Sequence, residues 1–172
     1  MIKKYFAGIG SRSTPSAVEP LIKSLCHKLV NLGYTLRSGG ASGADQMFEK
    51  YYDLYGGDKE IYLPWPNYND NKSPLYGFSN TALKLAEKFH PKWDRLTESG
   101  KKLMARNSHI ILGPKCIVVP EFVICWTPGG KEKGGTGQGI RMAKDFRIPI
   151  FNLALVDDIS KLESVIDNQD IF

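Results

Sequence analysis

Three glycine-rich segments constrain the fold of this chain more than any other feature of its 172 residues. The segments are Gly8-Ile9-Gly10-Ser11-Arg12, Ser38-Gly39-Gly40-Ala41-Ser42-Gly43-Ala44-Asp45 and Gly134-Gly135-Thr136-Gly137-Gln138-Gly139. Each follows a predicted strand and precedes a predicted helix, which is the arrangement of a parallel sheet with crossover helices. In such a sheet the three segments lie together at the carboxyl-terminal edge of the strands, where ligands of doubly wound α/β sheets bind.

The rest of the chain alternates between short apolar runs and helical periodicity. We predict strands at residues 5–9, 35–38, 59–63, 121–126 and 148–153. We predict helices at residues 15–32, 44–54, 79–88, 97–108 and 159–166, and a glycine-rich segment, 129–139, that leads into a helix ending near residue 146. Pro20 is unfavourable inside a helix that begins at residue 15, so the regular part of the first helix can begin near Glu19. This pattern indicates a single α/β domain over residues 1–172, with a mostly parallel sheet of five or more strands and helices on both faces.

Two segments have a distinctive composition. Residues 121–126 run without polar alternation, so we expect this strand to be the central one, buried on both faces. Residues 64–80 are rich in Pro, Asn, Asp and Tyr and predict a long surface loop. Loops of this length are either functional lids or disordered segments, and the sequence leaves both alternatives open.

Composition excludes several classes of protein. No apolar run approaches the roughly 18 to 20 residues of a membrane span, and the start of the chain is too soon broken by glycine for a signal peptide. The three cysteines and three histidines have no disulfide-framework or metal-ligand spacing. The net charge of +5 comes from scattered residues and permits an anionic ligand without indicating nucleic acid. We expect a cytoplasmic protein with no membrane partner, no metal and no cofactor.

The glycine-rich turns indicate an anionic ligand. Glycine lets the backbone approach a phosphate closely, and the helix start that follows offers unpaired N–H groups and the positive end of the helix dipole. Neither the phosphate loop of NTPases nor the dinucleotide-binding fingerprint is present, which disfavours a magnesium-dependent NTPase and an NAD dehydrogenase. The predicted ligand-binding residues in these turns are Gly8, Gly10, Ser11, Arg12, Ser38, Gly39, Gly40, Ser42, Gly43, Gly134, Gly135, Thr136 and Gly137.

Three further side chains complete the predicted binding site. Arg106 can contact an anion together with Arg12, which can hold a phosphate through two parallel hydrogen bonds. Asn107 can read a base edge or cap the end of its helix. Trp126 ends the predicted strand 121–126 at the ligand edge, where its ring can stack on a base.

Asp45 and Glu49 are the candidate catalytic residues. They are four residues apart and therefore share one face of the predicted helix 44–54. Either carboxylate can activate water or stabilise the oxocarbenium-like state of N-glycoside cleavage, and Asp45 can alternatively hold ribose hydroxyls. The structural alternative for both is that acidic residues near a helix start complement its dipole.

These motifs resemble those of the SLOG superfamily, a Rossmann-like group that includes the Lonely Guy phosphoribohydrolases, the DNA-processing protein DprA and nucleotide-sensing domains of bacterial defence systems. The resemblance covers most of the chain and rests on residues 8–12, 37–45, 126–130 and 134–137. It is closest to small stand-alone DprA-like members, which often occur in phage genomes. The resemblance implies a nucleotide or nucleotide-derived ligand, cleavage of an N-glycosidic bond in some branches, and a homodimer or higher homo-oligomer.

One departure from the family pattern bears on activity. Lonely Guy enzymes carry Pro-Gly-Gly-x-Gly-Thr-x-x-Glu, and the resemblance places their glutamate at Gly139 of this chain. An insertion, Lys131-Glu132-Lys133, also displaces the Pro-Gly-Gly element. Three functions therefore stay open: a nucleotide N-glycosidase that uses another carboxylate, a non-catalytic sensor or sponge for a nucleotide signal, and single-stranded DNA binding of the DprA kind.

Overall fold

A parallel five-stranded sheet organises the fold, and the computed structural model describes residues 2–169. The strand order is β3-β2-β1-β4-β5, with every neighbouring pair parallel. The strands are β1 (Lys4–Gly10), β2 (Tyr34–Ser38), β3 (Lys59–Ile61), β4 (Phe122–Trp126) and β5 (Ile150–Asn152). The predicted α/β domain with a parallel sheet is confirmed, while residues 1 and 170–172 of the predicted domain lie outside the described residues.

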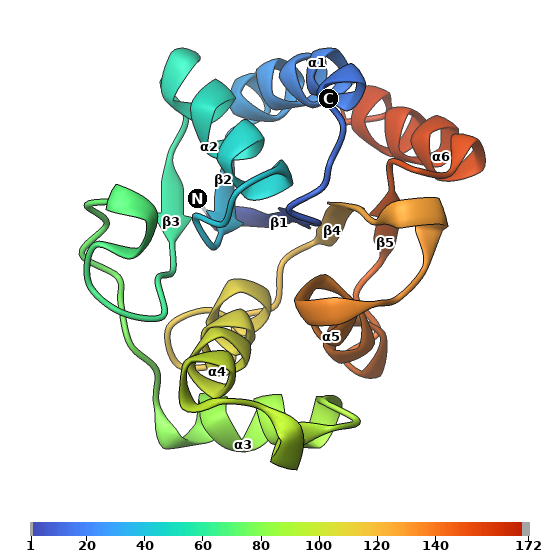
Figure 1. Ribbon diagram of the computed structural model, residues 1–172. Helices are drawn as coiled ribbons and strands as arrows, with labels where there is room; N and C mark the ends of the chain where they lie inside the picture. Colours follow the sequence, from blue (N-terminus) through green and yellow to red (C-terminus); the bar gives the residue numbers. More distant parts are fainter. Residues whose placement is uncertain (1, 170–172) are drawn as a thin grey trace.

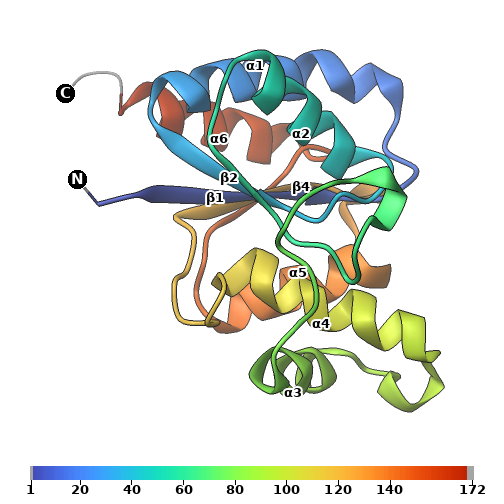
Figure 2. The ribbon, with the colours of Figure 1, turned by 90° about the vertical axis from the view of Figure 1, so that its left-hand side faces the viewer.

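The described residues form six α-helices, which cover both faces of the sheet as predicted (Figures 1 and 2). They are α1 (Glu19–Asn31), α2 (Ala44–Leu54), α3 (Asn80–Phe89), α4 (Glu98–Leu112), α5 (Gly134–Asp145) and α6 (Val156–Asp167). Helices α1, α2 and α6 lie on one face, and α4 and α5 lie on the other. Helix α3 packs on α4 and α5, on their side away from the sheet. Within residues 2–169, none of these helices has the length and apolar character needed to span a membrane.

Alternation along the strands divides the hydrophobic core into two layers. On β4, Phe122 and Ile124 pack in the cluster with α1, α2 and α6, whereas Val123 and Cys125 pack in the cluster with α4 and α5. Burial on both faces explains why the β4 sequence lacks polar alternation. The same burial pattern suits any interior strand, so the expectation that β4 is central was wrong in detail. The middle strand is β1, and β4 lies between β1 and β5.

The segment from Gly134 to Gly139 also differs from its prediction. Instead of forming a loop that leads into a helix, these residues are already the first turns of α5. Glycine has a low helix propensity, and packing overrides it here because Gly137 and Gly139 are buried against neighbouring groups. An added Cβ at Gly137 would lie 2.6 Å from the Glu132 carbonyl carbon. Absence of a side chain is therefore what lets the preceding segment pack against α5.

The long loop between β3 and α3 is ordered against the domain. It contains a short 3-10 turn, Tyr68–Asp70, and a bridge between Leu63 and Tyr76. Tyr68 is buried, and Trp65 packs against the hydrophobic core. The loop ends at Ser79, whose hydroxyl accepts the Ala82 amide hydrogen (3.1 Å) and caps α3. The disordered alternative therefore does not describe this segment, and a role as a lid stays a prediction.

Candidate functional site

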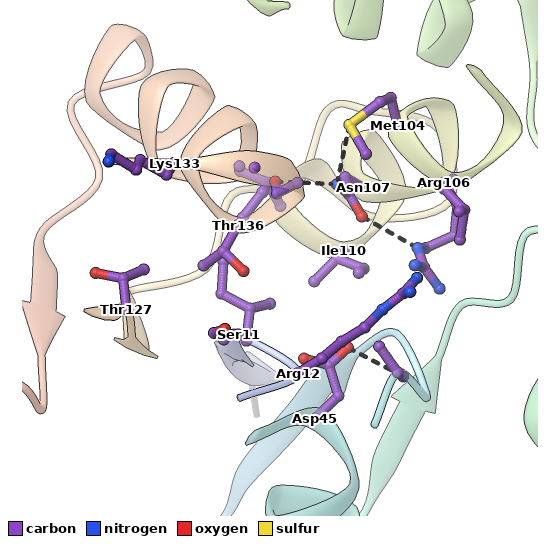
Figure 3. Close-up of a pocket in the computed structure, with 18 of the residues that line it drawn as sticks. Ser11, Arg12, Asp45, Met104, Arg106, Asn107, Ile110, Thr127, Lys133 and Thr136 are labelled. Atoms are coloured by element: carbon purple, nitrogen blue, oxygen red, sulfur yellow. Dashed lines mark hydrogen bonds between the residues drawn. The ribbon is translucent and has the colours of Figure 1, made fainter. Parts of the chain in front are cut away.

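A cavity of about 380 Å³ opens at the carboxyl-terminal ends of β1 and β4 (Figure 3). The strand order reverses between these neighbours, since β2 and β3 lie beyond β1 and β5 lies beyond β4. The cavity is lined by the end of β1, by the turn after β2 with the first turn of α2, by α4, by one residue of the long loop, and by the chain from the end of β4 to the start of α5. The lining residues are Ile9, Gly10, Ser11, Arg12, Ala41, Asp45, Tyr68, Leu103, Met104, Arg106, Asn107, Ile110, Ile111, Thr127, Pro128, Lys133, Gly134, Gly135, Thr136 and Gly139.

One wall of the cavity is apolar. Leu103, Met104, Ile110 and Ile111 reach it from α4, and Ile9 reaches it from β1. A mostly apolar lining with a few polar groups is typical of small-molecule sites, and the volume falls within the range of about 300 to 1,000 Å³ that such sites occupy. This wall suits the flat, weakly polar face of a ring.

Arg12 supplies a cationic group to the rim. Its side chain is exposed, and among the described residues it has no hydrogen bond or ion pair. Figure 3 shows it reaching toward Arg106, and its positive charge is one of the causes that lower the pKa of Arg106. Because Arg106 is already engaged by Asp45 and by two backbone carbonyls, Arg12 is the guanidinium group available to an anion at the rim.

The start of α5 supplies a second cationic region. Lys133 is the N-cap residue and makes no side-chain cap, and the first turn contains no acidic residue. The Gly137 amide is bonded to the Lys133 carbonyl (3.0 Å), whereas the turn before it carries the free N–H groups of a helix start. Gly134, Gly135 and Thr136 line the cavity at this end, so the positive end of the helix dipole faces it.

Arg106 is an anchor within the wall rather than a free anion contact. It is 4% exposed and donates from Nη1 to the carbonyl oxygens of Gly39 and Tyr62, the latter at 3.0 Å. Burial lowers the pKa of Arg106, and attraction to Asp45 opposes that shift. The side chain thereby ties α4 to the turns that follow β2 and β3.

Asp45 lies in the same wall and is 4% exposed. Its Oδ2 accepts the amide hydrogens of Gly39 (3.2 Å) and Ala41 (3.4 Å). Loss of hydration raises the pKa of Asp45 to about 6, against the attraction of Arg106 and the amide hydrogen bonds, which lower it. The carboxyl group therefore both organises the turn after β2 and changes its charge at mildly acidic pH.

Asn107 connects Arg106 to α5. Its Oδ1 accepts from Arg106 Nε (3.1 Å), as Figure 3 shows. Its Nδ2 donates to the Gly135 carbonyl (3.3 Å) and to Gln138 Oε1 (3.1 Å). Because both ends of the amide are engaged, Asn107 holds the start of α5 in place beside α4. The predicted alternative of a helix cap does not describe these contacts.

The structure brings together nine of the predicted residues on the cavity lining, which are Gly10, Ser11, Arg12, Asp45, Arg106, Asn107, Gly134, Gly135 and Thr136. They come from the end of β1 and the two residues after it, from the first turn of α2, from α4 and from the start of α5. The remaining predicted residues lie outside the lining, and most of them instead pack against other parts of the domain or make hydrogen bonds within it.

Gly8, Gly10 and Gly43 allow close packing of backbone. A Cβ added to Gly8 would lie 2.7 Å from Phe48 Cγ, and one added to Gly10 would lie 2.5 Å from the Cβ of Ala44. Both glycines therefore bring α2 close to β1, and only Gly10 also borders the cavity. Gly43 has a φ of 85° and packs against the backbone of residues 11–12, so it joins the first two glycine-rich turns.

The other residues of the second glycine-rich turn serve the fold or lie in solvent. Ser38 is fully buried, and its Oγ donates to the Gly8 carbonyl (2.6 Å). Gly39 is held by Asp45 and Arg106, as described above. Gly40 accepts a hydrogen bond from Asn69 (3.0 Å), and Ser42 is exposed outside the cavity.

Trp126, Glu49 and Gly137 also lie away from the lining. Trp126 packs with the cluster that contains Phe122 and Ile124, because strand alternation turns it toward the α1 and α2 face. Glu49 accepts hydrogen bonds from Lys59 (2.9 Å) and Asn71 (2.9 and 3.2 Å). Gly137 is buried inside α5.

Sequence reasoning missed the contribution of Tyr68. This residue lies in the long loop, yet its ring reaches the cavity and lies against Arg106, whose guanidinium carbon is 5.5 Å from the ring centre. The sequence shows only a tyrosine within a loop rich in Asn and Asp, and this pattern does not predict where the tyrosine side chain points. Across residues 2–169 no three His, Cys, Asp or Glu side chains are grouped so as to hold a metal ion.

Solved structures with a similar fold include two DNA processing proteins. DNA processing protein A from Helicobacter pylori, studied for its single-stranded DNA binding mode, gives a TM-score of 0.55 at 21% identity, over 96% of this chain and 73% of that one. DNA processing protein A (DprA) from Streptococcus pneumoniae gives 0.54 at 16% identity, over 95% of this chain and 56% of that one. This chain therefore spans little more than half of the pneumococcal protein.

The Moco carrier protein from Chlamydomonas rheinhardtii is also similar, with a TM-score of 0.50 at 13% identity, over 97% of this chain and 86% of that one. No protein-family model and no curated protein matches the sequence. At these identities the likeness establishes the fold alone. The chain has the Rossmann-like α/β fold found in the DprA proteins.

Proposed function

We propose that the cavity binds a phosphorylated nucleotide or a nucleotide-derived ligand. The observation that carries the proposal is the pairing of an unneutralised cationic rim with an apolar wall. Arg12, Lys133 and the first turn of α5 offer positive charge and hydrogen-bond donors, and α4 offers the apolar surface opposite. A phosphate and a base joined through a sugar combine the two kinds of group that these surfaces accept.

The arrangement also suggests an orientation for the ligand. The phosphate would lie between Arg12 and the start of α5, where the Thr136 hydroxyl points into the same space as Ser11 (Figure 3). The base would lie against Leu103 and Met104. The similarity of fold to a carrier of Moco supports binding of a small ligand without identifying it.

Calorimetry with matched ligands tests the proposal. We expect AMP, GMP, CMP or UMP to bind at least tenfold more tightly than the corresponding nucleoside, because only the monophosphate engages the rim. Equal affinity for nucleotide and nucleoside, or no binding of either, would contradict it.

Hydrolysis of the N-glycosidic bond is a second candidate, favoured by the position of Asp45 in the cavity wall and by its raised pKa. In this reaction the bond between C1′ and the base nitrogen breaks with its electron pair on the base. A water oxygen then bonds to C1′, and the water proton passes to the base. A carboxylate nearby stabilises the positive charge that develops at C1′.

Chromatography of the incubated nucleotides separates catalysis from simple binding. Released base together with ribose 5-phosphate supports an N-glycosidase. Tight binding without release supports the sensor or sponge alternative, which the glycine at position 139 favours because the family glutamate is missing there.

Single-stranded DNA is a third candidate, favoured by the similarity to the Helicobacter pylori protein. Several phosphates contacted along a strand would give a steep fall of affinity with salt, whereas a single mononucleotide in the cavity would give a shallow one. Titration of a labelled oligonucleotide at 50 and 200 mM salt distinguishes the two.

The proposal includes a cytoplasmic location and a homo-oligomeric state. Cys26, Cys116 and Cys125 are buried and unpaired, which suits a reducing compartment. Light scattering on the purified chain would measure its oligomeric state directly.

A further inference from the structure

We propose that Tyr68 is the aromatic side chain that contacts the base of the ligand beside the apolar wall of α4, and that residues 67–71 form a clasp that holds Tyr68 at the cavity. The inference rests on the proposed nucleotide binding and adds to it the residue that makes binding depend on the base. It also gives Glu49 a role in fastening the clasp.

Tyr68 is the one aromatic residue among the described residues that line the cavity. It is 7% exposed, and its ring is fixed by two neighbours. The Trp65 ring meets it edge-on, with centres 5.3 Å apart and planes at 89°, and the Arg106 guanidinium lies 5.5 Å from its centre. A rigid aromatic ring beside an apolar wall is what a planar base requires for stacking or edge contact.

The backbone around Tyr68 is held in an uncommon conformation. Asn67, Asn69 and Asp70 have φ values of 59°, 50° and 60°, in the left-handed region. Asn and Asp tolerate this region better than other residues with a side chain, but three of them within four positions persist only if surrounding contacts enforce the shape. The uncommon backbone conformation of this segment therefore fixes the position of Tyr68, which lies between Asn67 and Asn69.

Two side-chain contacts enforce that shape. Asn69 Nδ2 donates to the Gly40 carbonyl (3.0 Å), which ties the clasp to the second glycine-rich turn. Asn71 Nδ2 donates to Glu49 Oε2 (2.9 Å) and Oε1 (3.2 Å), which ties it to α2. Lys59 pairs with Glu49 at 2.9 Å and fixes the carboxylate in turn.

The first experiment compares AMP with ribose 5-phosphate, which has the same phosphate and sugar but no base. We expect Tyr68→Leu to weaken AMP binding about tenfold in calorimetry and to change ribose 5-phosphate binding less than twofold. Tyr76→Leu is the matched control, because Tyr76 lies in the same loop and is 57% exposed. That variant should bind both ligands like the wild type.

Asn71→Ala tests the clasp while leaving the Tyr68 ring intact, and it keeps the test decisive if Tyr68→Leu does not fold. We expect the same tenfold loss of AMP binding, with ribose 5-phosphate binding unchanged. Combining Asn71→Ala with Tyr68→Leu should cause no further loss, since both changes remove the same contact between Tyr68 and the base. Equal losses for the two ligands, or unchanged AMP binding in both variants, would overturn the assignment. If the wild type binds another of the four monophosphates in place of AMP, the same comparison is made with that nucleotide. A wild type that binds none of AMP, GMP, CMP and UMP would remove the proposed function itself, and Tyr68 with it. Wild-type binding with unaffected variants would remove only the role of Tyr68.

Discussion

Asp45 and Arg106 both bind the backbone of Gly39, Asp45 through its amide and Arg106 through its carbonyl. The Asp45 carboxylate accepts the amide hydrogen of Gly39 (3.2 Å), and Arg106 donates to the Gly39 carbonyl. Both side chains are 4% exposed, and attraction between them offsets part of the lost hydration of each. The pair fixes the cavity wall to which both belong, so its charge state bears on the stability of the domain.

Asp45 should make stability depend on pH. Its folded-state pKa is raised from 3.8 to about 6, so between these values the folded protein holds a proton that the unfolded chain releases. Raising the pH through this window therefore lowers the free energy of unfolding of the wild type relative to Asp45→Asn, by at most about 3 kcal/mol. Above pH 6 to 7 the difference should level off.

Urea unfolding of both proteins between pH 4 and 7 measures this difference. Asp53→Asn is the control, because Asp53 lies on the same helix with an exposed carboxylate. A wild-type curve parallel to that of Asp45→Asn across the window would show that Asp45 does not titrate there.

Arg12→Gln should weaken nucleotide binding by about 10- to 100-fold, as expected from losing a charged hydrogen bond worth about 1.5 to 3 kcal/mol. The melting temperature should stay unchanged, because Arg12 is exposed and has no partner among the described residues. Arg95→Gln, an exposed arginine away from the cavity, is the control for net charge. Identical dissociation constants for all three proteins would remove Arg12 from the site.

Thr136→Val keeps the shape of the side chain at the first turn of α5 and removes its hydroxyl. We expect affinity for a nucleoside monophosphate to fall by about 1 to 2 kcal/mol, with little change for the nucleoside. Calorimetry on the two ligands checks this. Matching losses would mean that Thr136 touches the sugar or base, or only supports the helix.

Ser38→Ala should affect stability and leave nucleotide binding intact. The Ser38 hydroxyl donates to the Gly8 carbonyl at 2.6 Å inside the core, away from the cavity lining. Removing this buried hydrogen bond should lower the free energy of unfolding by about 1 to 2 kcal/mol. Weakened binding in a variant with wild-type stability would instead return Ser38 to the site.

The arrangement of strands and helices follows from patterns local in the sequence. Apolar runs such as Phe122–Trp126, helical periodicity and glycines at strand ends predict a parallel α/β domain, because each depends on neighbours a few residues apart. The same reasoning places Ser11, Arg12, Asp45 and Thr136 at one edge, since all carboxyl-terminal strand ends in a parallel sheet share that edge.

Tertiary packing decided which of these residues face the cavity. Trp126 shares the ligand edge, yet strand alternation turns its ring toward the layer that contains Phe122 and Ile124. Gly8 admits Phe48 rather than a ligand, which depends on where α2 lies. Tyr68 lines the cavity from a loop whose contacts are distant in the sequence, since Asn69 bonds to Gly40, 29 residues away, and Asn71 bonds to Glu49, 22 residues away. Local patterns set which edge a residue occupies, but contacts between distant segments set the direction of its side chain, and the shape of the site depends on that direction.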